Sequence, residues 1–248
     1  MDKVTGVYFS PTGNTKKSVE AMMDALGGGG TIDLTEAHGA VERHFTAEEW
    51  VIFGAPVYGG RIPAAAKGRF AGLRGEQTPC IVVATYGNRD FDDALLELAD
   101  MAQAQGFAVR GAAALVGRHT YGEIQTTRPD VDDLAADRVF ALAAAQKPAD
   151  APAVEIPGSR PYKEGGSGGK FRPLTADGCV GCGLCARGCP VQAIAADNRT
   201  IGEACLACFR CIRRCPVGAK HIETDAYRMF AAGFTEQLKA RKENQYFL

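Results

Sequence analysis

Apolar runs alternate with amphipathic stretches over residues 1–147 of the chain. Continuous apolar runs that suit strands buried on both faces cover residues 4–9, 50–57, 80–86 and 107–116, and a weaker candidate covers 31–34. Between them, helical spacing of apolar residues predicts helices over 14–26, 90–106 and 131–146; Asp90 is the expected cap of the second and Gly106 its end. Strands that alternate with helices predict a parallel sheet with right-handed crossovers. Residues 1–147 are therefore expected to form one α/β domain.

The rest of the chain changes character twice. In residues 148–170, four prolines precede a Gly/Ser-rich run, which predicts a linker that tethers its neighbours closely without fixing one docking geometry. Residues 171–225 hold eight of the nine cysteines. Residues 226–248 predict a helix packed against the core, with a contact between two copies of a homodimer as the alternative. Its one-turn spacing comes from Tyr227, Phe230, Phe234 and Leu238, and the segment finishes in Tyr246, Phe247 and Leu248.

The composition of the chain gives no support to a nucleic-acid or membrane partner. The chain has 248 residues, 46% of them hydrophobic and 23% charged, and a formal net charge of −1. That balance does not favour a nucleic-acid partner or a polybasic membrane contact. No stretch reaches the roughly 18 consecutive apolar residues of a membrane span. The first ten residues lack a cationic segment followed by an apolar one, so we expect no secretory signal and a cytoplasmic location, where clustered thiols usually bind metal.

The loop after the first predicted strand suits a phosphate group. A helix follows the loop at once, so unpaired backbone N–H groups, the positive helix end and several hydroxyls would face a phosphate dianion there. Gly13 would let the backbone approach closely. The loop has no lysine, so the Walker pattern is missing and nucleotide hydrolysis is disfavoured. A capped strand–helix turn is the alternative. The candidate residues are Ser10, Thr12, Gly13, Asn14 and Thr15.

Two later loops resemble the other parts of a flavin site. In a sheet ordered 2-1-3-4-5, the loops after the third and fourth strands lie beside the phosphate loop, and each offers a tyrosine for stacking and a glycine near the ring. The three loops resemble those of flavodoxin, whose phosphate loop has the form Ser/Thr-x-Thr-Gly-x-Thr, and the resemblance implies FMN. FAD is disfavoured because no dinucleotide glycine fingerprint follows a strand. The added candidates are Pro56, Val57, Tyr58, Gly59, Gly60, Thr85, Tyr86, Gly87 and Asn88.

A few other residues could have a functional role although they belong to no complete motif. His119 and Tyr121 follow the fifth strand, where they would either border the flavin edge or lie in an ordinary surface loop. Cys80 is expected to be a buried thiol. The remaining histidines, His38, His44 and His221, show no partner pattern and are assigned nothing.

The eight clustered cysteines repeat the run C-x2-C-x2-C-x3-C-P of bacterial ferredoxins. Three thiolates at this spacing can reach three corners of a cube, and the fourth ligand must come from elsewhere. In two-cluster ferredoxins the fourth cysteine ligates the other cluster, so the resemblance implies two [4Fe–4S] clusters. Two zinc-binding pairs are the alternative, which leaves the third thiol of each run and the prolines unexplained. The implied ligands are Cys179, Cys182, Cys185 and Cys215 for one cluster and Cys205, Cys208, Cys211 and Cys189 for the other.

The second cysteine run also carries Arg210, Arg213 and Arg214. Nearby cations favour the reduced, more negative state of a cluster. We therefore hypothesise a higher potential for the cluster on Cys205–Cys211, with a solvated basic rim as the alternative.

Taken as a whole, the chain resembles the fused flavodoxin–ferredoxin proteins of anaerobic bacteria and archaea. The resemblance implies a flavodoxin-like doubly wound parallel α/β sheet, ordered 2-1-3-4-5, followed by a small α+β bacterial ferredoxin domain. It also implies electron transfer between FMN, two [4Fe–4S] clusters and external redox partner proteins, whose donor and acceptor stay open. A flavin-dependent reductase of a quinone or nitro compound and a redox-sensing interaction protein are the alternatives. Since no nicotinamide fingerprint or acid–base pair accompanies the flavin loops, an electron carrier is favoured over a substrate-specific enzyme.

Overall fold

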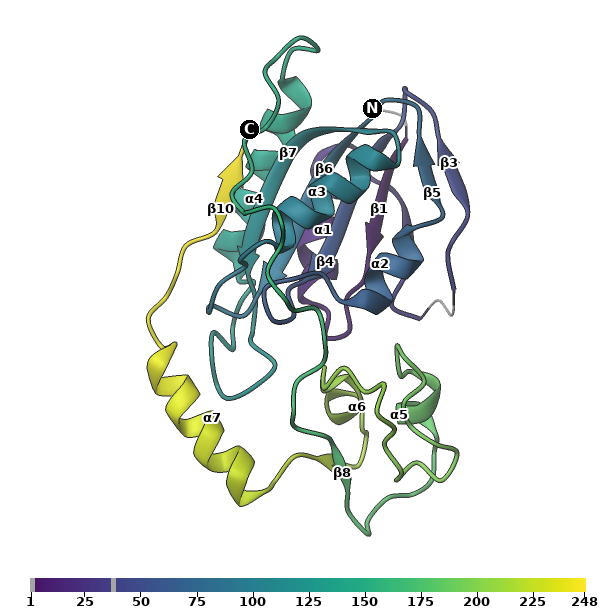
Figure 1. Cartoon of the computed structure of the whole chain (residues 1–248), viewed down its shortest axis with the longest axis vertical. Coiled ribbons are helices and arrows are strands. Elements are labelled where there is room, and N and C mark those ends of the chain that lie inside the picture. Colours follow the sequence, from purple (N-terminus) through teal and green to yellow (C-terminus); the bar gives the residue numbers. More distant parts are fainter. Residues whose placement is uncertain (1–2, 37–38) are drawn as a thin grey trace.

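The computed structural model describes residues 3–36 and 39–248, so His38 lies outside the described residues. A six-stranded sheet in the order β10-β7-β6-β4-β1-β2 forms the centre of the larger part (Figure 1). All strands but β10 are parallel. The five parallel strands have the order 2-1-3-4-5 in chain sequence, which confirms the flavodoxin-like prediction. Their bounds are β1 (Val4–Tyr8), β2 (Gly29–Asp33), β4 (Trp50–Pro56), β6 (Thr78–Tyr86) and β7 (Phe107–Val116), and the sixth strand is β10 (Gln245–Phe247).

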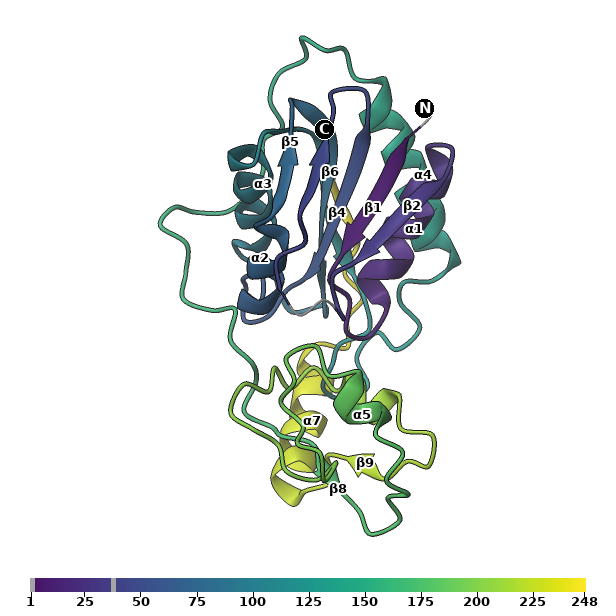
Figure 2. The same ribbon diagram turned by 90° about the vertical axis from the view of Figure 1, so that its right-hand side faces the viewer.

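Helices cover both faces of this sheet. In Figure 2, α1 (Asn14–Ala25) and α4 (Val131–Gln146) lie on one face, and α2 (Ala64–Phe70) and α3 (Ala94–Ala104) on the other. The three predicted helices are present. Neither α2 nor the small parallel sheet of β3 (Arg43–Phe45) and β5 (Leu73–Gly75) was predicted, because these elements are too short to show a period. Cys80 is fully buried on β6, as predicted.

The predicted start of α3 is wrong. The helix begins at Ala94 rather than beside Asp90. The Asp90 carboxylate instead accepts the Asp92 N–H at 3.0 Å and closes a turn before the helix. This turn places Phe91 edge-on against Tyr86, with ring centroids 5.6 Å apart. The side chain of Asp90 therefore caps this turn and does not cap the helix.

The end of the chain differs from the predicted single helix. Helix α7 (Asp225–Gln237) stops early, and β10 pairs antiparallel with β7 at the sheet edge. Tyr246 on β10 packs against Phe140 of α4, with ring centroids 4.9 Å apart. The last residues thus return to the larger part (Figure 1), and three residues are too few for the alternation that would reveal a strand.

Asp137 on α4 lies beneath this added strand and makes stability depend on pH. The side chain is fully buried, Tyr246 donates to its Oδ1 at 2.8 Å, and its Oδ2 has no partner among the described residues. Burial raises the pKa of this carboxyl to about 6. The folded state therefore holds the proton more tightly than the unfolded state. Stability should fall as the pH rises from about 4 to about 6, by about 3 kcal/mol in total.

We expect Asp137→Asn to remove this penalty, because the amide keeps the acceptor for Tyr246 without a buried charge. The variant should be more stable than the wild type at pH 8 by up to about 3 kcal/mol and should match it near pH 4. Urea unfolding at both pH values measures the difference. Parallel stability curves for the two proteins would show that Asp137 does not carry this pH dependence.

The cysteine-rich part has little regular structure. Strand β8 (Leu174–Thr175) pairs with β9 (Lys220–His221), and α5 (Leu184–Arg187) and α6 (Arg210–Arg213) are single turns. Its buried apolar cluster comprises Ala207, Phe209 and Ile222. Aromatic residues of α7 contact this part and also Tyr121 and His119 of the larger part; they are Tyr227, Phe230 and Phe234. No residue of α7 is buried, so packing against the core and contact between two copies both stay predictions.

The linker was expected to tether its neighbours closely without fixing one docking geometry, and in the structure hydrogen bonds hold it at defined positions. Residues 148–170 run along the α2–α3 side of the sheet toward the cysteine-rich part (Figure 2). The Asp93 carboxylate accepts N–H groups of Ser159 and Lys163, both at 2.8 Å, and the Gly166 N–H donates to the Tyr58 carbonyl at 2.8 Å. A proline-rich composition shows stiffness but cannot show which surface the segment contacts, so these bonds to distant loops were not predictable.

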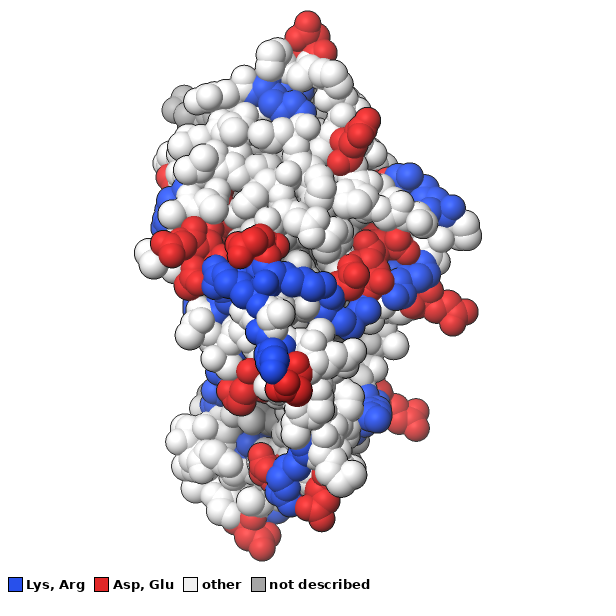
Figure 3. All heavy atoms as spheres, turned by 90° about the vertical axis from the view of Figure 1, so that its left-hand side faces the viewer, with Lys and Arg blue, Asp and Glu red and all other residues white. Residues whose placement is uncertain are grey.

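The charges on the surface are mixed, as the near-zero net charge of the chain suggests. Acidic and basic side chains lie interspersed in a band across the middle of the face shown in Figure 3. In the part of the chain that the structure describes, no helix combines the length and the apolar character that crossing a bilayer requires.

Candidate functional site

A cavity of about 290 Å³ lies at the carboxyl ends of β1, β4 and β6, where the larger part meets the cysteine-rich part. Eleven of the fourteen residues predicted for FMN line it. They are Ser10, Thr12, Asn14, Thr15, Pro56, Val57, Tyr58, Gly59, Thr85, Tyr86 and Gly87. The three loops therefore converge on one space, because parallel strands place their carboxyl ends at one edge of the sheet.

The β1–α1 loop has a backbone suited to an anion. Gly13 has φ 91°, a left-handed conformation that glycine adopts without strain, and it precedes the first residue of α1. The Ser10 hydroxyl accepts the Lys16 N–H at 3.0 Å, and the Asn14 amide donates to the Arg118 carbonyl at 2.9 Å. Ser10 and Asn14 thus hold the loop in shape. The hydroxyls of Thr12 and Thr15 and the backbone N–H groups of Asn14 and Thr15 remain for a ligand.

Gly13, Gly60 and Asn88 do not line the cavity, and Asn88 has a different task from the one predicted. Its Nδ2 donates to the carbonyls of Leu238 and Ala240 at 2.8 and 2.7 Å, and its Oδ1 accepts the Lys242 N–H at 3.1 Å. These bonds fix the segment between α7 and β10. An asparagine in a glycine-containing loop looks the same in sequence whether it faces a flavin or a distant backbone.

The two tyrosines of these loops also differ. Tyr86 is buried in the core beside Phe91, whereas Tyr58 is half-buried on the cavity wall. Burial raises the pKa of both phenols, so both hydroxyls stay protonated at neutral pH. Tyr58 is therefore the tyrosine of the two placed to stack on a ring.

His119 and Tyr121 line the cavity, which favours the interpretation that their loop borders the site. His119 Nδ1 accepts the Tyr121 N–H at 2.8 Å, and burial lowers the pKa of the imidazole to about 4. The ring is thus neutral at pH 7. Tyr121 reaches the aromatic residues of the cysteine-rich part, with its ring centroid 5.2 Å from that of Phe209.

Sequence reasoning missed the remaining wall, which comes from three separate segments: Arg118 and Thr120, Ser167 to Gly169, and Leu206 and Ala207. The Gly/Ser run of the linker gave a signal for flexibility only, and its approach to the site depends on small side chains. A Cβ at Gly168 would lie 2.6 Å from the Cys205 carbonyl oxygen, so only glycine fits there without a shift.

The cavity has unsatisfied groups that FMN could use. Thr85 Oγ1 and Arg118 Nε are buried and have no hydrogen-bond partner among the described residues. Both residues line the cavity. Because a buried polar group without a partner is costly, these atoms indicate a polar ligand at this position. The donor set, with a helix start at one end and Tyr58 on the wall, fits a phosphorylated aromatic ligand.

The eight cysteines gather around two smaller cavities. The outer four-cysteine site comprises Cys179, Cys182, Cys185 and Cys215. The inner four-cysteine site comprises Cys189, Cys205, Cys208 and Cys211, and its cavity shares Leu206 with the large cavity. Each site takes three cysteines from one run and the last from the other run. This is the crossed arrangement that the resemblance to two-cluster ferredoxins implies.

The spacing of these thiols disfavours zinc. Tetrahedral zinc requires sulfur atoms about 2.3 Å from one metal ion. No three His, Cys, Asp or Glu side chains in residues 3–36 and 39–248 come close enough to hold a single ion. Burial raises the pKa of Cys208 to about 11 and of Cys211 to about 12. Four buried thiols at such a site would bind as thiolates only with a cationic group between them.

Two arginines of the second run, Arg210 and Arg214, have partners outside the cysteine-rich part. Arg210 donates to the carbonyls of Pro11 and Gly188, each at 2.9 Å, and also pairs with Glu36. Arg214 donates to Glu36 at 2.9 Å. The two side chains therefore connect the cysteine-rich part to the β1–α1 side of the sheet. Arg210 also acts on the charge of Cys208, and Cys208 acts on Arg213, so the higher potential expected for the cluster on Cys205–Cys211 stays a prediction.

Residues 174–195 match the family described as 4Fe-4S binding domain, and comparison with curated proteins gives no match. The rubredoxin oxygen:oxidoreductase of Desulfovibrio gigas is 16% identical over 59% of this chain, which spans only 36% of that protein, with a TM-score of 0.42. An archaeal flavodoxin is 15% identical over 58% of this chain and 96% of its own, with a TM-score of 0.39. Flavodoxin 2 from Bacillus cereus is 15% identical over 58% and 98%, with a TM-score of 0.43. The parallel 2-1-3-4-5 sheet and the 4Fe-4S match together give this chain a fused flavodoxin–ferredoxin architecture.

Proposed function

We propose that this chain is an electron-transfer iron–sulfur flavoprotein with FMN in the large cavity and one [4Fe–4S] cluster in each four-cysteine site. The observation that carries the proposal is the shared wall: Leu206 lines both the large cavity and the cavity of the inner site. FMN supplies two-electron and one-electron chemistry and the clusters supply one-electron chemistry. Tethering them in one chain makes a relay between a flavin and an external partner.

The residues around the shared wall have definable tasks in this relay. The phosphate would bind at the start of α1, and Tyr58 and the neutral His119 would border the ring. Leu206 and Ala207 exclude water between the two sites. The outer site shares no residue with the large cavity, and its Cys182 is exposed. The outer cluster is therefore the one that an external redox protein would reach.

Anaerobic redox titration of the purified protein tests this proposal. We expect one FMN and eight iron atoms per chain, and EPR signals of two [4Fe–4S] clusters upon reduction. Protein purified without air that lacks flavin absorption, or that carries iron for a single cluster, would contradict the proposal.

Thr12→Asp should weaken FMN binding strongly. The substitution places a carboxylate beside the phosphate position, and like charges about 4 Å apart cost about 4 kcal/mol at an effective dielectric constant of 20. We expect the dissociation constant to rise on the order of 100-fold or more, measured by quenching of flavin fluorescence. Thr12→Val is the matched control, since it removes the hydroxyl without adding charge, and its loss should be much smaller. Equal losses in both variants would argue against a phosphate at this loop.

One observation favours a reductase of small electrophiles as a second candidate. A groove of about 500 Å³ between the 118–123 loop and α7 shares Arg118 and Thr120 with the large cavity, so a small molecule could approach the flavin from there. Stopped-flow mixing of the reduced protein with quinones, nitro compounds and a ferredoxin-dependent oxidoreductase separates the two functions. Rapid oxidation by the small molecules alone would favour the reductase.

A further inference from the structure

Arg69 is a buried cation that reaches from the flavodoxin-like part to the inner four-cysteine site. It lies on α2 and is 7% exposed. Its Nη1 donates to the carbonyls of Leu34 and Thr35 at 2.7 and 3.0 Å, and its Nη2 donates to the carbonyl of Pro190, the residue after Cys189. The guanidinium carbon also lies 5.3 Å from the ring centroid of Phe9. Neutral groups thus hold the charge in one position.

No carboxylate neutralises this charge at close range. Among the described residues, Arg69 takes part in no ion pair, and Glu36 of the neighbouring loop pairs with Arg210 and Arg214 instead. Asp33 acts on Arg69 only at longer range, since its exposed carboxylate accepts the Thr35 N–H. A buried charge without a close partner is strongly unfavourable. Among the described residues, the negative groups that act on Arg69 are the exposed Asp33 and Cys189 of the inner site, the residue before the Pro190 carbonyl that Arg69 contacts.

We infer that Arg69 is the electrostatic partner of a cluster in the inner site and raises its midpoint potential from across the domain boundary. This inference rests on the proposed function, which places a [4Fe–4S] cluster on Cys189. A cluster with four thiolates carries about −2 when oxidised and about −3 after it accepts one electron. The electron changes the cluster charge without forming or breaking a bond, and Arg69 stays singly positive. The fixed cation therefore stabilises the reduced state more than the oxidised state.

The outer site offers an internal comparison. Lys220 lines its cavity, is 3% exposed and donates to Thr175 Oγ1 at 2.6 Å. Each four-cysteine site thus has its own buried cation, one from the flavodoxin-like part and one from the cysteine-rich part. Lys220 also acts on Cys211 of the inner site, so Lys220→Met should move the outer cluster most and the inner cluster less, whereas Arg69→Gln should move mainly the inner cluster.

The test is an EPR-monitored redox titration of the holoprotein under anaerobic conditions. Arg69→Gln should shift one cluster to a more negative midpoint, by at least a tenfold change in its one-electron equilibrium, or about 59 mV. Lys220→Met should shift mainly the other cluster. Arg69→Lys keeps the charge and should stay near the wild-type midpoint. Arg74→Gln is the matched control, because Arg74 is exposed and donates only to the carbonyls of Ala71 and Leu73.

The outcomes distinguish failure of the Arg69 inference from failure of the proposed function. Equal midpoints in Arg69→Gln and Arg74→Gln, or equal shifts in Arg69→Gln and Arg69→Lys, would overturn the inference while leaving the two clusters in place. If Arg69→Gln loses the inner iron, retention of that iron by Arg69→Lys supports the inference and its loss from both variants overturns it. Iron for fewer than two clusters in the wild type would instead refute the proposed function.

Discussion

Chelating the iron should unfold residues 171–225 while the flavodoxin-like sheet stays folded. Besides the cluster of Ala207, Phe209 and Ile222, the cysteine-rich part buries a few small or isolated apolar side chains such as Ala193, Ile194 and Ala219, and its two paired strands are two residues long each. A segment of this size buries too little apolar surface to fold securely alone, so metal binding supplies most of its folding free energy. Hydrogen exchange measured by mass spectrometry should show full loss of protection there and none in peptides from β4 and β6.

The same experiment should report on the flavin cavity. Leu206 and Ala207 form part of its wall, so the loss of the cysteine-rich structure opens one side of the cavity to water. FMN should then bind more weakly to the iron-free protein, although the β1–α1 loop is intact. Protection of 171–225 that survives iron removal would show that packing against Tyr121 and α7, rather than the clusters, holds this part together.

The sequence was sufficient for the elements whose pattern is local. The runs over 50–57 and 107–116 became strands at nearly the predicted bounds, since strands buried on both faces are apolar throughout. Helix α4 occupies 131–146 as predicted, and its N-cap Asp130 forms a capping box with Asp133. Short elements escaped detection. Strand β10 forms because it pairs with the edge of β7, which lies more than a hundred residues away in the chain.

The sequence predicted which loops form the site but not which partners its charged residues have. Loops that follow parallel strands must meet, which explains why most predicted FMN residues line one cavity. The partner of a charged residue is not local, however. The sequence could not show that Arg210, besides acting on Cys208, is engaged by Glu36, which lies 174 positions away. Arg69 raised no expectation at all, because nothing in a short amphipathic helix shows that one side chain reaches another domain.

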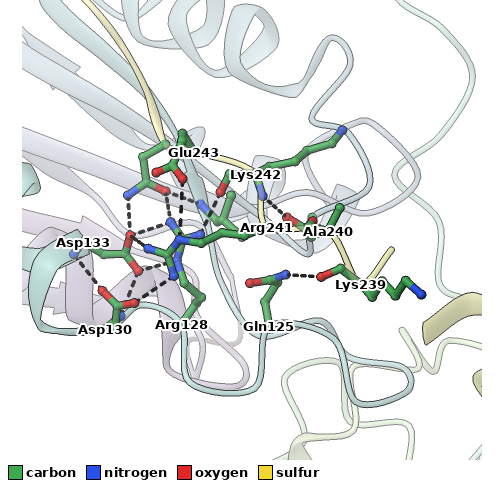
Figure 4. Close-up of polar contacts among 12 residues, drawn as sticks. Gln125, Arg128, Asp130, Asp133, Lys239, Ala240, Arg241, Lys242 and Glu243 are labelled. Carbon is green, nitrogen blue, oxygen red and sulfur yellow. Dashed lines mark hydrogen bonds and ion pairs between the residues drawn. The ribbon is translucent and has the colours of Figure 1, made fainter. Parts of the chain in front are cut away.

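Arg128→Met should cost the flavodoxin-like part about 3–5 kcal/mol, because it breaks a buried ion pair and leaves the Asp133 carboxylate facing only the exposed and more distant Arg241, at 3.6 Å, among the described cations. The Arg128 side chain is completely buried and pairs with Asp133, which is 4% exposed. Its Nη1 also donates to the Lys242 carbonyl at 2.8 Å, and its Nη2 donates to Asn244 Oδ1 at 2.9 Å (Figure 4). One guanidinium thus connects the start of α4 to the segment that leads into β10. Urea unfolding followed by tryptophan fluorescence measures the loss, since the single tryptophan, Trp50, lies on β4.

Arg241→Met is the matched control for this prediction. Arg241 pairs with Asp130 at 3.0 Å and with Asp133 at 3.6 Å, but its side chain is 45% exposed, so solvent screens both pairs (Figure 4). An exposed pair of this kind contributes about 0–1 kcal/mol. A loss in Arg128→Met no larger than in the control would mean that Asp133 is satisfied without the guanidinium. The carbonyl of Arg128 also accepts the Arg118 N–H at 3.0 Å. If Arg128→Met destabilises the protein far more than the control does, it should therefore also loosen the loop that carries His119 and Tyr121. The stability of the sheet edge and the shape of the cavity wall would then depend on the same buried charge.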